Sequence, residues 1–158
     1  MKAIQFFKTV IPAVALSSLF IFSSCDKDDD DDDIKTYTIS GDANGSQEVP
    51  AVSTGAIGTL TGNYDVSTNV LNYNITWSGL SGNVNAAHIH GPAMMGENAG
   101  VIHPLNVTTN GLSGVISGAV TLSDSTETQL LAGNLYYNLH TAMHPNGEIR
   151  GQISTSRN

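Results

Sequence analysis

The segment Val70-Leu-Asn-Tyr-Asn-Ile-Thr-Trp77 decides the fold class, because large apolar residues alternate in it with small polar ones. Successive side chains of a β-strand leave on opposite sides, so the apolar residues from Leu71 to Trp77 would share one face. The segment 55–65 alternates in the same way, and residues 66–69 between the two are typical of a turn. The sequence therefore predicts a hairpin of two half-buried strands. Tyr73 and Trp77 are expected in the core; the alternative is an exposed aromatic platform for a glycan.

Similar short segments lie on both sides of this hairpin. Further strands are predicted at residues 35–40, 84–90, 101–107, 114–122, 135–141 and 148–154. The first of them is expected at a sheet edge. One short helix is predicted over Asp124–Leu131, capped by Asp124 or Ser125. Roughly seven to nine short strands with at most one short helix indicate an all-β fold, an immunoglobulin-like or Greek-key β-sandwich.

The first 24 residues have the layout of a secretory signal peptide. A basic start at Lys2 and Lys8 precedes an apolar stretch that is too short to span a bilayer comfortably. Phe22-Ser-Ser-Cys25 follows and resembles the lipobox of bacterial lipoproteins, with Phe22 in place of the usual leucine. Cys25 is the only cysteine, so an internal disulfide is excluded and acylation of Cys25 is predicted. The alternative is an ordinary signal with an incidental cysteine.

Residues 25–34 are predicted to form an acidic, disordered tether, because a run of like charges repels itself and stays extended. Lysine and aspartates just after the cysteine resemble the surface-export signal of Bacteroidetes lipoproteins. The resemblance implies an exported outer-membrane lipoprotein, held by its lipid and exposed at the cell surface. After residue 33 the chain has seven acidic residues and only three basic ones, Lys35, Arg150 and Arg157. This net negative charge makes nucleic acid an unexpected partner.

The histidines are confined to two segments, 87–103 and 135–153. They are His88, His90, His103, His140 and His144. His88 and His90 lie two apart and would share one face of a strand. If the two segments form neighbouring strands, His140 and further imidazoles would meet them, and imidazole is a common ligand of zinc and copper. The alternative is a structural role, with the rings bonded to backbone carbonyls or to a buried polar network.

Three methionines lie in the same loops as these histidines, namely Met94, Met95 and Met143. Thioether sulfur beside imidazole favours copper, particularly Cu(I), so these residues are candidate ligands. Methionine also fills gaps in cores, which is the alternative here. Glu148 and Arg150 are expected to form a structural pair in the last strand, because no second carboxylate is placed for catalysis.

Two of these segments resemble the CHRD (chordin-type) domain. They are Ala87-His-Ile-His-Gly-Pro-Ala93 and a closing stretch that runs from Tyr136 through Asn138, His140 and Thr141 to Gly147-Glu-Ile-Arg-Gly-Gln152. Gly45-Ser-Gln-Glu-Val-Pro50 is similar to the family's opening loop. The resemblance implies a CHRD domain over residues 35–156, an immunoglobulin-like β fold and an extracellular location. It transfers no activity.

Two kinds of function remain open from the sequence. The first is a non-enzymatic binding or adhesion module for an unidentified protein or glycan, displayed on the cell surface. The alternative is a copper- or zinc-binding surface protein with a redox role. No Ser/His/Asp order, phosphate-binding loop or zinc-hydrolase helix motif is present, so the sequence favours a protein that is not an enzyme without deciding the question.

Overall fold

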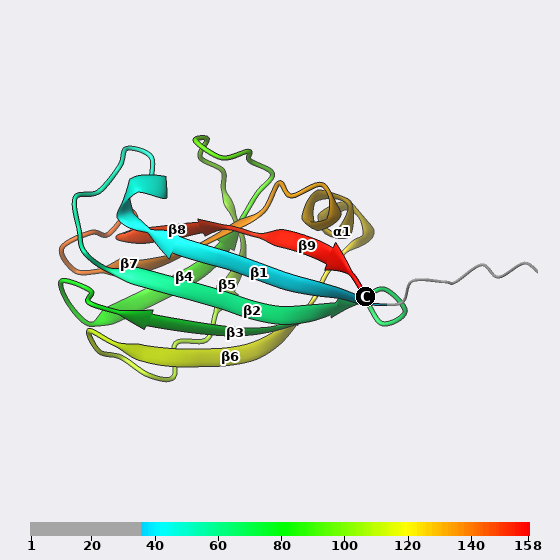
Figure 1. Ribbon diagram of the computed structural model, residues 1–158, viewed down its shortest axis with the longest axis horizontal. Helices are drawn as coiled ribbons and strands as arrows, with labels where there is room; N and C mark the ends of the chain where they lie inside the picture. Colours follow the sequence, from blue (N-terminus) through cyan, green and yellow to red (C-terminus); the bar gives the residue numbers. More distant parts are fainter. Residues whose placement is uncertain (1–35) are drawn as a thin grey trace, which may run out of the picture. The chain divides into compact units, whose positions relative to one another are not determined.

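The computed structural model describes residues 36–158 (Figure 1). The predicted signal peptide 1–24, the predicted lipidation site Cys25 and the predicted tether 25–34 lie outside these residues. The elements are β1 (Thr36–Asn44), β2 (Ile57–Asp65), β3 (Val70–Ser78), β4 (Val84–His90), β5 (Val101–Leu105), β6 (Gly114–Thr121), α1 (Asp124–Leu131), β7 (Tyr136–Thr141), β8 (Ile149–Gln152) and β9 (Ser154–Arg157), with a short 3-10 turn at Gly45–Gln47. The prediction of an all-β fold is confirmed. In this part of the chain, no helix is long and apolar enough to cross a membrane.

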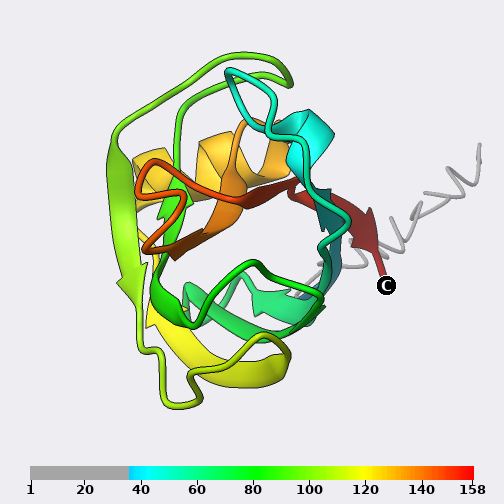
Figure 2. The same ribbon diagram turned by 90° about the vertical axis from the view of Figure 1, so that its left-hand side faces the viewer.

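All nine strands belong to one antiparallel sheet, in the order β5-β4-β7-β8-β1-β2-β3-β6, with β9 added beside β1. The sheet curls until its two end strands approach each other, which makes a nearly closed barrel (Figure 2). The predicted Greek-key sandwich is not confirmed, because hydrogen bonds run from strand to strand without dividing the sheet into two layers. Alternating apolar residues bury one face equally well when a sheet curls on itself.

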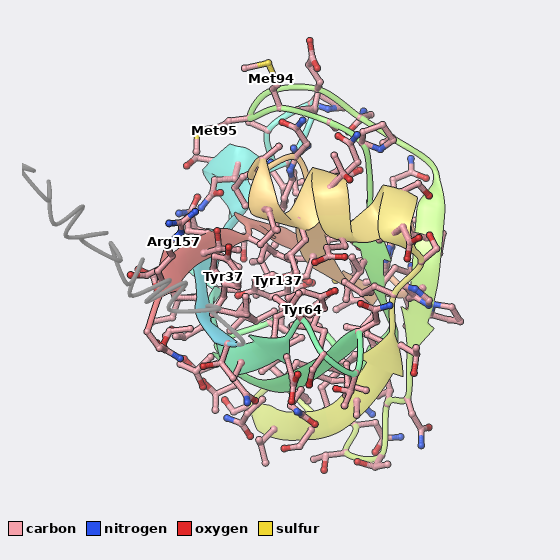
Figure 3. The ribbon with its side chains drawn as sticks, turned by 90° about the vertical axis from the view of Figure 1, so that its right-hand side faces the viewer. Tyr37, Tyr64, Met94, Met95, Tyr137 and Arg157 are labelled. Atoms are coloured by element: carbon pink, nitrogen blue, oxygen red, sulfur yellow. The ribbon has the colours of Figure 1, made fainter. Side chains whose placement is uncertain are left out.

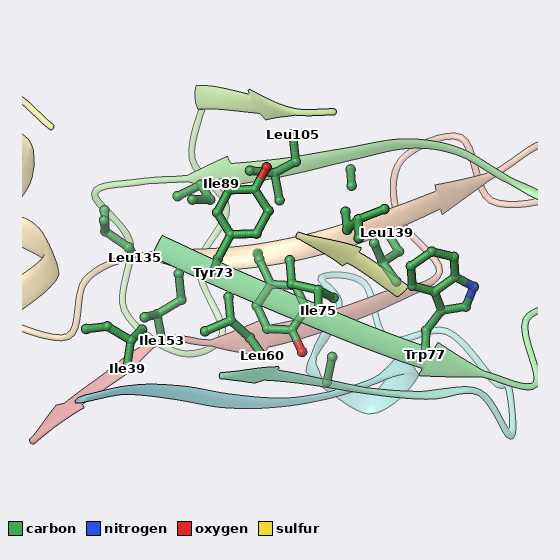
Figure 4. Packing of buried hydrophobic residues seen from close by; sticks show 14 of the residues in the cluster. Ile39, Leu60, Tyr73, Ile75, Trp77, Ile89, Leu105, Leu135, Leu139 and Ile153 are labelled. Carbon is green, nitrogen blue, oxygen red and sulfur yellow. The ribbon is translucent and has the colours of Figure 1, made fainter. Parts of the chain in front are cut away.

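The predicted hairpin is confirmed as β2 and β3. Its turn is fixed by Asp65, whose Oδ1 accepts hydrogen bonds from the backbone N–H groups of Ser67 and Thr68. Asn69 ends the turn with a φ of 57°. The apolar face of β3 points into the barrel, where it packs in one core with apolar residues from other strands (Figure 4). Both aromatics of β3 are buried, so they belong to the core and form no glycan platform.

β1 is not the edge strand that its sequence suggests. It pairs with β2 along its whole length, and on its other side with β9 and, at Asn44, with β8. The strand β9 was not predicted, because Ser154–Arg157 contains no apolar residue. It forms because the chain, after the end of β8, runs alongside the free edge of β1 and pairs with it. In this pairing Tyr37 lies opposite Arg157.

The helix has the predicted bounds, but neither predicted residue caps it. Ser123 is the N-cap: its backbone is extended, with ψ 158°, and its hydroxyl accepts a hydrogen bond from the N–H of Thr126 at 3.3 Å. Asp124 already lies in the first turn, where a carboxylate interacts favourably with the helix dipole. Leu130 is its buried anchor to the core.

Candidate metal centre

The outward face of β4, β7 and β8 is polar and is nevertheless buried at its centre. Cross-strand pairing places His88 beside Asn138 and His90 beside Tyr136. On the other side of β7, Asn138 faces Arg150. Every residue of β7 is buried, so the strand is covered on both faces. The covering on the polar side comes from loops, whose backbone carbonyls bond to these side chains as described below.

Three histidines meet on this face. Nδ1 of His88 and Nε2 of His140 lie 2.9 Å apart, and one ring nitrogen from each of His88, His90 and His140 lies within 4.8 Å of the others. His90 and His140 are 8% and 7% exposed, whereas His88 is half-buried. Ligands of one zinc or copper ion lie about 2 Å from the metal, so small ring movements suffice to bring the three nitrogens to a common ion. The predicted convergence of the two motif segments therefore exists.

Loop carbonyls fix the orientation of two of these rings. Nδ1 of His140 lies 3.0 Å from the carbonyl oxygen of Pro145, and Nδ1 of His90 lies 3.0 Å from that of Ala99. A carbonyl oxygen only accepts, so each Nδ1 carries the hydrogen. In the neutral rings Nε2 then carries the lone pair, and that of His140 accepts a hydrogen bond from Nδ1–H of His88 unless a metal takes its place. Histidines that bind metals commonly donate their second N–H in this way.

The Nε2 atom of His90 contacts the side-chain amide of Asn138, whose Oδ1 lies 3.0 Å away. With Nδ1 bonded to Ala99, this contact is a hydrogen bond if the amide presents its NH₂ group or if the ring carries both protons. An ion bound at Nε2 would replace the contact. Asn138 is 2% exposed and would then turn toward its other neighbours, Glu48 and Gly147.

The surroundings of His88 and His140 disfavour positive charge on these two rings. Burial lowers the pKa of His88, and the neighbouring His140 and His90 lower it further. Burial also lowers the pKa of His140, although its bond to Pro145 opposes the shift. Both rings are therefore neutral near pH 7, and their lone pairs are available to a metal without competition from a proton.

The other candidate ligands do not join this cluster. His103 lies on β5 opposite Ile89, and His144 lies in the turn after β7, where its backbone bonds to Thr141. The methionine side chains are exposed on the surface: Met94 is 65%, Met95 69% and Met143 68% exposed. Figure 3 shows the first two pointing outward from the loop between β4 and β5. Sequence spacing groups the methionines with the histidines, but the loops that carry them turn their side chains outward.

Glu148 and Arg150 do not form the expected pair; each has its own partners. Glu148 is fully buried just before β8, and its carboxylate accepts hydrogen bonds from the hydroxyls of Thr54, Ser81 and Thr141 and from the backbone N–H of Ser81. Burial alone would raise the pKa of Glu148, but these bonds outweigh it and the pKa is lowered. The residue therefore joins the loop 79–82 to the end of β7.

Arg150 holds the loop that covers the histidines. Its guanidinium donates to the carbonyls of Glu97 at 2.6 Å and Met94 at 3.1 Å, and it lies 3.5 Å above the ring centre of Tyr136. Tyr136 in turn stacks on His90, with ring centres 4.7 Å apart and planes 2° apart. Arg150 is thus connected to the histidine cluster through an aromatic ring.

Glu48 was not singled out from the sequence. It follows the turn at Gly45–Gln47, is 7% exposed, and lines a surface hollow with Val49, Pro145 and Gly147. Burial raises the pKa of Glu48 to about 7, although Arg150 and Asn138 act in the opposite direction. Among the described residues its Oε1 has no hydrogen-bond partner. Only the resemblance of 45–50 to an opening loop pointed to this segment.

A change of Glu48 to glutamine should alter the pH dependence of folding. Between pH 4.5 and about 7 the folded chain keeps a proton on Glu48 that the unfolded chain has released, so stability falls as pH rises through this window and is level above it. We expect Glu48→Gln to lack this loss of about 2–3 kcal/mol. Urea unfolding of both proteins at pH 5 and pH 8 measures it; an equal difference between them at the two pH values would contradict the prediction.

Comparison with known proteins identifies one family. The sequence pattern of the CHRD domain matches residues 39–153, which include the whole histidine cluster and all strands except the start of β1 and the whole of β9. No curated protein and no solved structure shows significant similarity to the chain.

Proposed function

This chain belongs to the CHRD domain family, and on that premise we propose that its domain binds one copper or zinc ion through His88, His90 and His140. The observation that carries the proposal is the convergence of three imidazoles with ring nitrogens within 4.8 Å of one another, two of them oriented at Nδ1 by the carbonyls of Pro145 and Ala99.

The donor set supports copper or zinc over other ions. The cluster contains three imidazoles and no carboxylate, whereas Ca²⁺ and Mg²⁺ are bound by oxygen ligands. Three protein ligands leave a further position on a tetrahedral ion. His88 is the least buried of the three, so an ion would enter and exchange on its side of the cluster.

The proposal includes where the site is held. A signal peptide over residues 1–24, acylation of Cys25 and an acidic tether over 25–34 would place the domain outside the cell, on an outer membrane, within reach of metal ions and of a protein or glycan partner. Binding itself is the proposed activity, and no catalytic step is assigned. The two aromatics of β3 are buried, so they do not support the adhesion alternative through a glycan platform.

Metal analysis of the purified full chain tests the proposal. The protein is incubated with Cu²⁺, with Cu⁺ under ascorbate, or with Zn²⁺, and then desalted. We expect about one ion per chain at pH 7, where His88 and His140 are already in the neutral form that binds metal. Less than about one-tenth of an ion per chain for all three metals would refute the function, since a site of three buried imidazoles should survive desalting.

A further inference from the structure

The histidine cluster lies next to a fixed positive charge. Arg150 is 1% exposed and is held by two loop carbonyls, so its guanidinium cannot move away from the face it occupies. Because β4 and β8 flank β7, His90 and Arg150 lie on opposite faces of Tyr136, at 4.7 Å and 3.5 Å from its ring centre. The guanidinium therefore lies roughly one Debye length from His90, about 8 Å at physiological ionic strength, and because both groups are buried its charge is screened less than at the surface.

No anionic ligand offsets this charge within the cluster. The three donors are imidazoles, and none of them is a carboxylate or a thiolate. Glu48 is the carboxyl group that interacts with Arg150, and because burial raises its pKa to about 7, it only partly neutralises the guanidinium near pH 7. A divalent ion at this site would meet a stronger repulsion than a monovalent one, since the energy scales with the product of the charges.

We propose that the ion held by His88, His90 and His140 is Cu(I), and that the stack of Arg150 on Tyr136 on His90 selects it over Cu(II) and Zn(II). The inference rests on the proposed metal-binding function and names its substrate as the monovalent copper ion. It does not depend on the methionines, which are exposed on the surface. Arg150 is not itself a ligand; it acts on the bound ion through its positive charge, which the stack on Tyr136 holds in place.

The affinity of the full chain for each ion tests the inference without any variant. Cu(I) affinity is measured by competition with a colorimetric Cu(I) chelator, and Zn(II) and Cu(II) affinities by competition with chelators for those ions. We expect Cu(I) to bind at least about tenfold more tightly than Zn(II), the ratio that one unit charge at this distance supplies. Equal or tighter binding of Zn(II) would overturn the selectivity and leave the metal-binding function intact. Failure of every ion to bind would refute that function instead.

Two variants separate charge from structural damage. Arg150→Gln removes the positive charge, and we expect the midpoint potential of the bound copper, titrated by one electron per ion, to fall by about 59 mV, the equivalent of tenfold. Arg150→Lys keeps the charge and should retain most of the potential. At pH 8, Glu48→Gln removes the opposing negative charge and should raise it. If the midpoint potential shifts with the same sign in Arg150→Gln and Glu48→Gln, the proposal is overturned. Shifts of the same sign indicate that the loops are disrupted in both variants and that charge does not set the potential.

Discussion

Replacing both His88 and His90 by alanine is expected to abolish metal binding, with a loss of at least about 1,000-fold in affinity, or about 4 kcal/mol. The reason is that the double variant removes two of three imidazoles that meet within 4.8 Å. Loss of a hydrogen-bond partner behind a ligand already costs about 10–100-fold, and direct ligands should cost more. Competition with a chelator of known affinity measures the change.

The matched control is the double variant His103→Ala/His144→Ala. It removes the same number of imidazoles, one from each of the two histidine segments, from positions outside the cluster. Its affinity should stay within about twofold of the wild type, because neither imidazole belongs to the group that would hold the ion and distant sites couple only weakly. If both double variants lose the metal to the same degree, binding is a property of histidine content and the proposed centre is refuted.

A change of Glu148 to alanine is expected to destabilise the fold by about 3 kcal/mol or more. The carboxylate is fully buried and accepts four hydrogen bonds, from Thr54, Thr141 and both the hydroxyl and the N–H of Ser81. Its removal leaves the buried hydroxyl of Thr141 without an acceptor, which costs about 1–3 kcal/mol, and also breaks the partly buried charged hydrogen bonds from Thr54 and Ser81. Urea denaturation at pH 7 gives the free energy of unfolding.

Two further variants make this measurement specific. Asp42→Ala removes an exposed carboxylate whose one side-chain donor, Thr59, lies at 3.3 Å, and it should change stability by less than about 0.5 kcal/mol. Glu148→Gln keeps one acceptor and should fall between the two. The pKa of Glu148 is lowered in the folded state, so its stabilisation is complete above pH 4.5 and is lost as pH falls through the folded value. A deficit of Glu148→Ala that is unchanged at pH 3 would contradict this account.

The strands and the helix could be predicted from the sequence where local periodicity carried the signal. The alternation from Leu71 to Trp77 predicted β3 and its buried face, and the bounds of α1 were predicted correctly. β9 could not be predicted, because Ser154–Arg157 has no apolar face and forms a strand only beside β1. Its absence from the prediction is also why β1 was expected at an edge.

The candidate site was predicted in part. Two-residue spacing placed His88 and His90 on one face, and the resemblance of the closing stretch pointed to His140. Their meeting depends on β4 pairing with β7, a contact between residues 52 positions apart. Glu48 and the carbonyls of Ala99 and Pro145 carry no sequence signal for a site, because burial beneath loops and the direction of a backbone carbonyl are set by the folded chain alone.

The sequence by itself determined that the chain forms short strands with one apolar face each, because side-chain alternation and turn residues act over a few neighbouring positions. Only the tertiary structure decided that these strands join into one curled sheet, that β7 is buried on both faces, and that three imidazoles meet while the methionines stay outside. Those features arise from pairing between distant segments and from loops that cover a polar face, and hydrophobic periodicity contains no information about either.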